Sequence, residues 1–368
     1  MKIGVITTSR ADFGIYLPLL NKIKESEHHL MLFAGGMHTA SHFGNSHQLI
    51  EEAGFIIGEM VDGISTDDSP FGLCESMALT LAGFSAVWKK YADELDVVFV
   101  LGDRFEMYAA ASSIIPYNII IAHLHGGETT LGAIDNKFRN AISMLSDYHF
   151  VSHEKHAEKL VQMTGDSARI FNVGALGVEN LLGQSLMSTD AFFEKFKFDI
   201  SKDYILTTIH PETVSAGKNV HFIDEYIAAV KEIDIPVLCT LPNADTEGSV
   251  LRAALLDFEK QFPQKLKCFE NLGIVGYFTA MKNCLIMLGN TSSGIIEAAS
   301  YQKWVIDLGD RQKGRFAPSN VVHVPFDRKE IVRNVQSLRT TDVNVSQNPY
   351  GKGNTAEQIL GILETVFI

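Results

Sequence analysis

Titratable side chains follow directly on two apolar runs of this sequence. His125 and Glu128 come after NIIIAHL, and Gly126 and Gly127 between them allow a tight turn. Asp103 ends a second run, VVFVLGD. Carboxylates beside a histidine are the groups that abstract a proton and return it, so this set predicts acid–base chemistry.

A further acid lies in the stretch GAIDNKFRN. Asp135 and Arg139 are four residues apart, which places them on one face of a short predicted helix. Asp135 is therefore either another acid–base group or a helix-terminal acid that pairs with Arg139.

The stretch LGNTSSGIIEAAS has the residue types that hold a phosphate. It reads as a strand, a turn of small residues and the start of a helix, where free N–H groups and the helix dipole favour an anion. Glu297, about one turn into that helix, is suited to accept hydrogen bonds from two ribose hydroxyls. An ordinary serine N-cap is the alternative. The turn consists of Thr291, Ser292, Ser293 and Gly294, the last of which leaves room for a ligand beside the backbone.

Cationic side chains follow other apolar runs. Arg10 comes just after the first run, in TSRADFG, and His210 lies between a run and Pro211 in TIHPET. Arg311 and Arg315 belong to GDRQKGR, which reads as a flexible basic loop that closes over a diphosphate. The alternatives are a surface arginine, a structural histidine and a solvated charge run.

The elements that must position these residues alternate along the chain. Runs such as KIGVITTS, HLMLFAGG and DVVFVLGD predict strands, and stretches such as RFEMYAAASSII and HFIDEYIAAVKEI suit the helices between them. This alternation predicts parallel sheets covered on both faces. We predict an α/β fold of two Rossmann-like, doubly wound lobes, residues 1–172 and 173–350, with a C-terminal helix at 351–368 that packs back on the first lobe.

The candidate residues gather after the predicted strands. Asp103 and His125 do so in the first lobe, and His210, Asn243 and Arg311 in the second. Ligands of open parallel sheets bind outside the carboxyl ends of the strands. If the two lobes face each other, the groups of both converge on one central cleft.

Composition narrows the function further. The 368 residues carry a net charge of -13, which argues against binding of nucleic acid or of an anionic membrane. The four cysteines are widely scattered and form no CxxC pair, so we expect free thiols in a cytoplasmic protein and no metal site. We also expect no membrane-spanning segment. The chain contains no GxGxxG fingerprint, P-loop or serine nucleophile elbow.

Several of these stretches together resemble the UDP-N-acetylglucosamine 2-epimerase family, and most closely its hydrolysing branch, which supplies N-acetylmannosamine for sialic acid synthesis. The motifs TSRADFG, GMH, LGDRFEM, HLHGGETTLGAID, HPET, NADT, GNTSSGIIE and GDRQKGR occur in the family's order. The resemblance covers nearly the whole chain. It implies two lobes of the glycosyltransferase-B type with UDP bound mainly by the second.

The resemblance also implies roles for matching positions. Asp103, His125 and Asp135 match the family's acid–base residues. Residues expected to hold UDP are His210, Asn243, Thr291, Ser292, Gly294, Glu297 and Arg311 in the second lobe, with Arg10 and Arg104 reaching it from the first. Two stretches depart from the commoner family pattern. Related enzymes often carry Glu in place of His125, and IDNKFRN stands where the family commonly reads IDDSIRH.

The implied reaction takes UDP-N-acetylglucosamine and water to N-acetylmannosamine and UDP. A base, His125 or Asp103, removes the proton from C2 while UDP leaves C1, and Asp135 assists. The resemblance implies neither NAD nor a metal as cofactor, and it implies a homo-oligomer, a dimer or a tetramer. The alternatives are the same chemistry on UDP-N,N'-diacetylbacillosamine, a non-hydrolysing epimerase, a glycosyltransferase and a UDP-sugar sensor without turnover.

Overall fold

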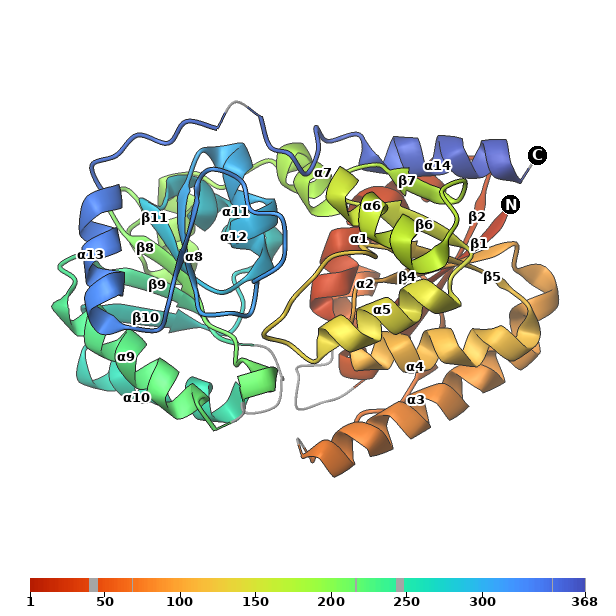
Figure 1. Ribbon diagram of the computed structural model, residues 1–368, viewed down its shortest axis with the longest axis horizontal. Coiled ribbons are helices and arrows are strands. Elements are labelled where there is room, and N and C mark those ends of the chain that lie inside the picture. Colours follow the sequence, from red (N-terminus) through yellow and green to blue (C-terminus); the bar gives the residue numbers. More distant parts are fainter. Residues whose placement is uncertain (40–45, 68, 216, 243–247, 346, 368) are drawn as a thin grey trace. The chain divides into compact units, whose positions relative to one another are not determined.

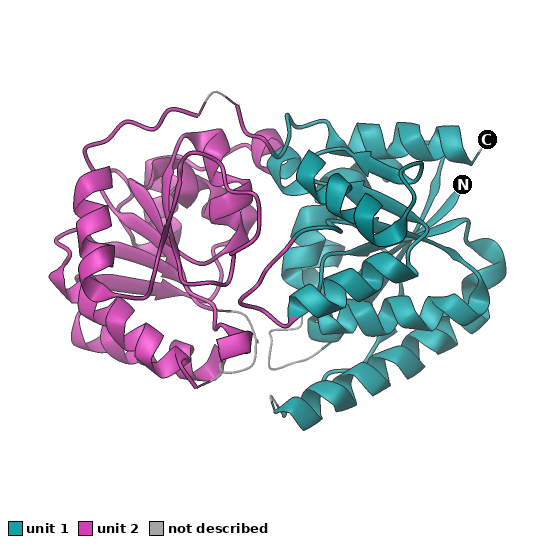
Figure 2. Ribbon diagram, in the orientation of Figure 1, with its two compact units in different colours: residues 1–128, 135–180, 350–368 teal, residues 129–134, 181–349 magenta. Residues whose placement is uncertain are grey.

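The computed structural model describes residues 1–368 except 40–45, 68, 216, 243–247, 346 and 368 (Figure 1). The chain forms two compact units, drawn in different colours in Figure 2. Unit 1 comprises Met1–Glu128, Asp135–Asn180 and Tyr350–Ile368, and unit 2 comprises Thr129–Ile134 and Leu181–Pro349. The main crossing from unit 1 to unit 2 follows Asn180, and the sequence placed the hinge around residues 172–180.

Unit 1 is built on a seven-stranded sheet in the order β3-β2-β1-β4-β5-β6-β7, with every neighbouring pair parallel. Because side chains alternate across a strand, β1 contributes Ile3 and Val5 to one core and Ile6 to the other. Both faces of this sheet are therefore apolar and must be covered by helices. The strands are β1 (Lys2–Thr7), β2 (His29–Gly35), β3 (Ile57–Val61), β4 (Val97–Leu101), β5 (Ile120–Leu124), β6 (Tyr148–Val151) and β7 (Ile170–Asn172).

Helices cover the two faces of this sheet. One core includes buried side chains of α1 and α14, and the other includes those of α3, α4 and α5. The C-terminal helix is fixed to unit 1 because Glu179 accepts a hydrogen bond from the backbone of Ala356 and α14 packs on α1. The helices are α1 (Arg10–Lys24), α2 (His47–Glu52), α3 (Pro70–Tyr91), α4 (Phe105–Ile114), α5 (Asp135–Leu145), α6 (Glu154–Thr164), α7 (Leu176–Gly183) and α14 (Thr355–Val366).

Unit 2 repeats this plan with a six-stranded parallel sheet in the order β10-β9-β8-β11-β12-β13. In both sheets the first strand is central and the order reverses beside it, between β1 and β4 and between β8 and β11. Such reversal points are where open α/β sheets bind ligands. The strands are β8 (Ile205–Thr208), β9 (Val237–Thr240), β10 (Leu266–Phe269), β11 (Ile286–Gly289), β12 (Trp304–Leu308) and β13 (Val321–Val324).

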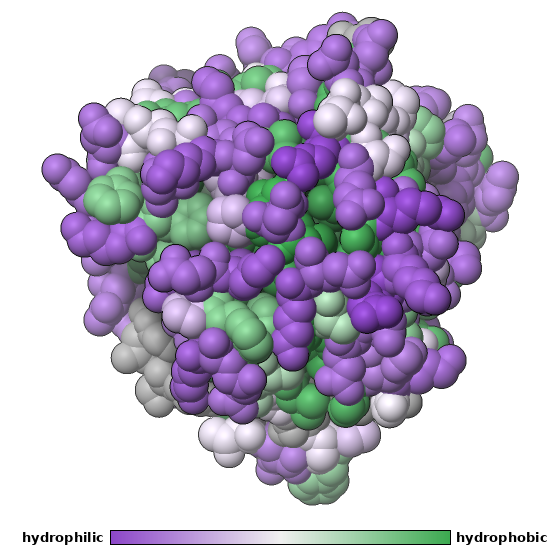
Figure 3. Space-filling view, turned by 90° about the vertical axis from the view of Figure 1, so that its left-hand side faces the viewer, coloured by the Kyte–Doolittle hydropathy of each residue, from purple (hydrophilic) through white to green (hydrophobic). Residues whose placement is uncertain are grey.

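The helices of unit 2 are mostly amphipathic. In α13, for example, Ile331, Val335 and Leu338 are buried and recur at helical spacing. Figure 3 looks onto the side of unit 2 that carries α9, α10 and α13, and hydrophilic residues predominate there. The helices are α8 (Thr189–Phe196), α9 (Asn219–Glu232), α10 (Gly248–Gln261), α11 (Gly273–Asn283), α12 (Ser292–Ile296) and α13 (Arg328–Leu338). The predicted α/β class with two doubly wound sheets is confirmed.

One helix has the length and composition of a membrane span. It covers Pro70–Glu94, with α3 as its main part, and 33% of its most apolar window is buried inside the protein. The sequence reading missed this stretch because a few polar residues interrupt it. Core helices of water-soluble proteins pass the same test, and α3 packs along α4.

Candidate active site

His125 follows β5 directly and is held in an unusual backbone conformation. Its φ angle is +62°, in the left-handed region that residues other than glycine rarely adopt. Its backbone N–H donates to the carbonyl of Phe150 on the neighbouring strand. Its ring Nδ1 lies 2.7 Å from Oε1 of Glu128. A residue that its surroundings hold in such a rare backbone conformation, at the end of a strand, is typical of functional sites.

Glu128 fixes the tautomer of His125. Oε1 of Glu128, which is fully buried, also accepts a hydrogen bond of 2.9 Å from the hydroxyl of Ser152. That hydroxyl lies 3.1 Å from Nδ1 of His156 on α6. An ionised carboxylate only accepts, so Nδ1 of His125 is the donor in this pair. Nε2 is buried and has no hydrogen-bond partner among the described residues.

Asp103 forms an ion pair with Arg139 of α5. Asp103 follows β4 after Gly102, and its side chain is 24% exposed, whereas that of Arg139 is 3% exposed. Arg139 thus pairs with the acid of a neighbouring strand end, and Asp135 begins α5 one turn before it. Asp103, His125 and Glu128 all belong to the carboxyl edge of the unit 1 sheet, as the sequence predicted.

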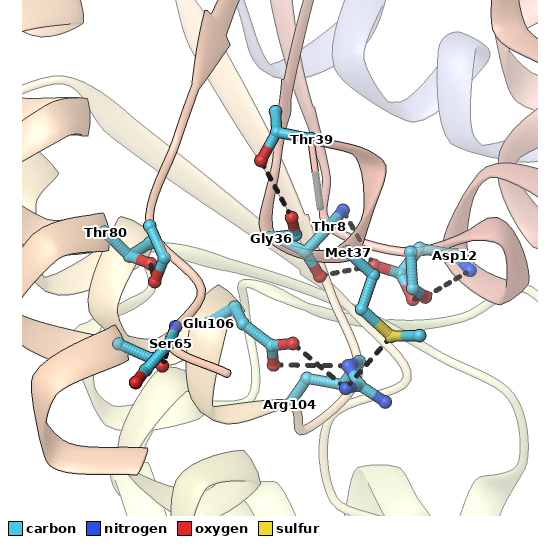
Figure 4. A network of polar contacts seen from close by, with 12 residues as sticks. Thr8, Asp12, Gly36, Met37, Thr39, Ser65, Thr80, Arg104 and Glu106 are labelled. Atoms are coloured by element: carbon cyan, nitrogen blue, oxygen red, sulfur yellow. Dashed lines mark hydrogen bonds and ion pairs between the residues drawn. The ribbon is translucent and has the colours of Figure 1, made fainter. Parts of the chain in front are cut away.

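Arg104 is oriented by a buried acid (Figure 4). Its Nη2 and Nε donate to the two carboxylate oxygens of Glu106 at 2.9 and 3.2 Å, and Nη2 also contacts the sulfur of Met37. Burial raises the pKa of the Glu106 carboxyl, and the adjacent Arg104 charge opposes that rise. The guanidinium is therefore held at the N-terminus of α4 before any ligand binds.

Arg10 begins α1 in a turn that its neighbours make rigid. The Asp12 carboxylate accepts hydrogen bonds from the backbone and hydroxyl of Thr8 and from the hydroxyl of Ser9. Ser9 in turn caps the helix. Figure 4 shows the bonds between Asp12 and Thr8.

His123 is a structural histidine. It is fully buried within β5, where Nδ1 lies 3.0 Å from the Ser143 hydroxyl and Nε2 lies 2.9 Å from the Gly102 carbonyl. Burial lowers its pKa to about 3. Of the two histidines at this strand end, His123 has both ring nitrogens bound, whereas Nε2 of His125 has no partner among the described residues.

In unit 2 the small-residue turn leads into a helix of five residues, α12. Thr291 is its N-cap but makes no side-chain capping bond. Burial raises the pKa of the nearby Tyr277 to about 12, and an interaction with the Ser293 side chain opposes that rise. A Cβ on Gly294 would lie 2.8 Å from Cγ1 of Val305, so this glycine lets α12 pack on β12. Its expected role beside a bound ligand stays a prediction.

His210 is fixed through its backbone. The Asn290 side chain, at the end of β11, accepts from the N–H of His210 at 2.7 Å and donates to its carbonyl at 2.8 Å. Gln312 donates to the carbonyl of Asn290 at 2.8 Å. These amide side chains keep His210 at the carboxyl edge of the sheet. Thr291, Ser292 and Glu297 lie at the same edge, on the segment that follows β11.

The basic loop 309–315 is bound to the HPET segment. Arg311 donates from Nη1 to the Pro211 carbonyl at 2.7 Å, and Glu212 accepts from the backbone of Asp310 at 2.5 Å. Glu212 is buried, and burial raises its pKa. Arg315 donates to the Gln312 side chain at 2.5 Å. The loop is thus an ordered part of unit 2, which the interpretation as a solvated charge run does not explain.

The sequence reading missed some residues that hold the candidates in place. Glu212 and Gln312 belong to the motifs HPET and GDRQKGR, so both residues could have been found from the sequence. Ser152 gave no signal, because its partner Glu128 is distant in the sequence. Asn243 lies outside the described residues. Among the residues that the structure describes, no three His, Cys, Asp or Glu side chains gather as a metal site would require.

Known proteins resemble this chain over its full length. The family model for UDP-N-acetylglucosamine 2-epimerase matches residues 21–364. The hydrolysing UDP-N,N'-diacetylbacillosamine 2-epimerase of Legionella pneumophila is 31% identical over 99% of this chain and 96% of its own. The polysialic acid biosynthesis protein P7 of Escherichia coli is 31% identical over 99% of this chain and 93% of its own.

Solved structures share the fold. The UDP-GlcNAc 2-epimerase of Neisseria meningitidis, bound to UDP-GlcNAc, aligns with a TM-score of 0.80 and 16% identity over 99% of this chain and all of its own. The enzyme of Methanocaldococcus jannaschii, in complex with UDP-GlcNAc and UDP, aligns with a TM-score of 0.82 and 20% identity over 99% and 100% of the two chains. The fold is therefore of the glycosyltransferase-B type. With the family model matched over most of its length, the chain belongs to the UDP-N-acetylglucosamine 2-epimerase family.

Proposed function

We propose that this enzyme is a hydrolysing UDP-sugar 2-epimerase whose substrate is UDP-N-acetylglucosamine and whose products are N-acetylmannosamine and UDP. The observation that carries the proposal is the His125–Glu128 pair at the end of β5. One ring nitrogen of His125 is bound to a buried carboxylate, and the other has no partner among the described residues. A histidine held in this way is a general base.

The substrate's shape defines the reaction. In an α-linked sugar nucleotide, the hydrogen on C2 and the C1–O bond are anti to each other. Removal of that proton and departure of UDP leave a double bond between C1 and C2, a 2-acetamidoglucal. Water then adds at C1, and a proton returns to C2 on the opposite face. One water is consumed, and the sugar is released with its C2 configuration inverted.

Unit 1 supplies the proton chemistry in this proposal. Nε2 of His125 takes the proton from C2, and Glu128 stabilises the imidazolium that forms. Ser152 keeps the Glu128 oxygen in place for that task. Asp103, paired with Arg139, and Asp135 are the candidates for returning a proton to the other face.

Unit 2 supplies the nucleotide site. Arg311, Arg315 and His210 stand on the segments that follow β12 and β8, and the backbone of each segment is held by buried polar side chains. Donors fixed in advance stabilise the charge that develops on a departing diphosphate, an effect worth several kcal/mol per donor. Thr291, Ser292, Ser293 and Glu297 bind the remainder of the nucleotide. Arg10 and Arg104 are proposed to contribute from unit 1.

A second substrate is favoured by the names of two relatives. The proteins of Legionella pneumophila and of Campylobacter jejuni, the latter 32% identical over 87% of this chain and 83% of its own, are described as hydrolysing epimerases of diacetylbacillosamine nucleotides. In this chain HLHGGE stands where that branch tends to show HIEGGE. We therefore place UDP-N-acetylglucosamine first.

Incubation of the purified enzyme with each of the two UDP-sugars tests the proposal. Release of UDP is followed with a coupled assay, and the sugar product is identified by chromatography. We expect free N-acetylmannosamine from UDP-N-acetylglucosamine, without any added acceptor. Faster turnover of the bacillosamine nucleotide would transfer the proposal to that substrate. A product that still carries UDP would show a non-hydrolysing epimerase and refute the proposed reaction.

A further inference from the structure

The chain crosses between the two units around one short segment. Thr129–Ile134 belongs to unit 2, whereas both of its covalent neighbours, Glu128 and Asp135, belong to unit 1. We call residues 129–134 the strap. The chain thus leaves unit 1 directly after the residue that orients His125 and re-enters it at another proposed acid–base residue. No residue separates the strap from either of them.

Backbone hydrogen bonds bind the middle of the strap to unit 2. The N–H of Leu131 donates to the Lys313 carbonyl, and the N–H of Gly132 donates to the Asp310 carbonyl, both at 3.0 Å. The carbonyl of Gly132 accepts from the N–H of Val214 at 3.3 Å. The partners lie on the basic loop 309–315 and on the HPET segment, the two segments proposed to hold the diphosphate.

A side chain binds the end of the strap. The hydroxyl oxygen of Thr213, within the HPETV stretch, accepts a hydrogen bond of 3.0 Å from the N–H of Ile134. Asp135 is the next residue. Ile134 is therefore hydrogen-bonded to the HPET segment, and the next residue, Asp135, begins α5 of unit 1.

The contact at Gly132 leaves no space for a side chain. A Cβ there would lie 2.7 Å from N and Cα of Arg311 and 2.7 Å from the carbonyl carbon of Asp310. These are backbone atoms, which cannot move aside as a flexible side chain does. Gly132 does not have the left-handed backbone that strains other residues. Substitution to alanine therefore acts through this contact alone.

We propose that the strap couples the nucleotide segments of unit 2 to the acid–base residues of unit 1, with Gly132 and Thr213 as positioning residues. This inference rests on the proposed function, in which loop 309–315 and the HPET segment bind the diphosphate. A bound diphosphate adds contacts to those segments, and the strap transmits the added restraint to Glu128 and Asp135. A displacement of about 1 Å at the reacting groups lowers turnover by up to about 100-fold.

The kinetic test compares Thr213→Val with Thr213→Ser. Valine keeps the shape of threonine but lacks the acceptor oxygen, and serine restores it. We expect Thr213→Val and Gly132→Ala to lower kcat by roughly 10- to 100-fold, with the Kd for UDP within about twofold of wild type. Thr213→Ser should recover most of the activity. Gly361→Ala in α14 is the matched glycine control, because a Cβ there meets nothing within 4 Å.

A second measurement is independent of turnover. Hydrogen–deuterium exchange of the whole enzyme is followed with and without UDP. In wild type, UDP should slow exchange in peptides that cover residues 135–145 of unit 1. In Thr213→Val that protection should disappear although UDP still binds. A fold defect in Gly132→Ala would leave Thr213→Val to decide, since it removes one oxygen acceptor only.

The outcomes separate the two proposals. A Kd for UDP that rises in step with the fall in kcat would overturn the proposed role of the strap, because its hydrogen bonds to unit 2 would then serve nucleotide binding itself. Unchanged kcat and unchanged exchange in both variants would overturn it too. Wild-type enzyme that binds UDP but hydrolyses neither sugar would refute the proposed function, and the exchange experiment would still decide on the strap. Wild-type enzyme that does not bind UDP would overturn both.

Discussion

The two units share a strand order but differ in what stands at their carboxyl edges. In unit 1 the edge holds ionisable side chains in pairs, His125 with Glu128 and Asp103 with Arg139. In unit 2 amide and carboxylate side chains, such as Asn290, hold the backbone of the loops. Paired acids and bases can exchange protons, whereas a braced backbone with arginines holds an anion in place. In the proposed function the same topology therefore serves two different tasks, and the side chains after the strands set which task each sheet performs.

The largest expected effect comes from the acid–base edge of unit 1. His125→Ala removes the proposed base, and general-base groups contribute about 100- to 10,000-fold to a rate. We expect kcat to fall by that factor while the Kd for UDP, measured by calorimetry, stays near wild type. A variant that loses UDP binding to the same extent would place His125 in the nucleotide site and erase the distinction between the units.

Acid should weaken unit 1 before unit 2. Burial lowers the pKa of His123 to about 3 and that of His149 to about 4, so these side chains stay neutral in the folded state. Their contribution to stability is complete above the unfolded pKa near 6.5 and is lost as pH falls toward those values. At pH 4.5 each of these two histidines should lower the free energy of unfolding by about 2 to 3 kcal/mol.

In unit 2 the pKa of one histidine, His323, is shifted in the opposite direction. A hydrogen bond with Asp307 raises the pKa of His323, so its contribution is present at acidic pH and is lost as pH rises through the raised pKa. Hydrogen exchange of strands β4 and β11 between pH 7 and 4.5 measures the difference. Loss of protection in β11 at a higher pH than in β4 would contradict this prediction.

The anion edge of unit 2 should respond in binding. Arg311→Ala removes a charged donor, and hydrogen bonds to charged groups contribute about 1.5 to 3 kcal/mol. We expect the Kd for UDP to rise by roughly 10- to 100-fold. Lys329→Ala, at an exposed position in α13, is the control for loss of a positive charge. Equal effects of the two substitutions would show that only the net charge matters.

The smallest effect should come from the residue behind the proposed base. Ser152→Ala removes one neutral donor from Glu128, and a bond of this kind is worth about 0.5 to 1.5 kcal/mol. Turnover should fall severalfold without a change in the Kd for UDP, and Ser152→Thr should restore it. A fall as large as that of His125→Ala would mean that the serine takes part in the chemistry directly.

Much of the fold could be predicted because the central strands are buried on both faces and read as continuous apolar runs. Apolar runs in the sequence predicted β1, β2, β4 to β9, β11 and β12. They omitted β3, β10 and β13, which are three of the four edge strands, and β7, the fourth, was predicted from ARIFNVGALG. Edge strands are partly exposed, so their sequences, such as VVHV in β13, lack such a run. The strand-end candidates were found for the same reason: they follow strands that are easy to recognise.

Other features depended on contacts between distant positions. The ion pair of Arg139 with Asp103 joins distant positions, whereas sequence spacing points only to Asp135, four residues from Arg139. The membership of residues 129–134 in unit 2 has no local signature, because their bonds are made mainly by the backbone. The role of Gly294 in packing against Val305 likewise appears only in three dimensions.

The central claim is that unit 1 exchanges the hydrogen on C2 while unit 2 releases UDP. Turnover of UDP-N-acetylglucosamine in deuterated water, followed by NMR, tests both halves at once. We predict free N-acetylmannosamine with deuterium at C2, in amounts equal to the UDP formed. Protium retained at C2, or a deuterated sugar still attached to UDP, would contradict the account.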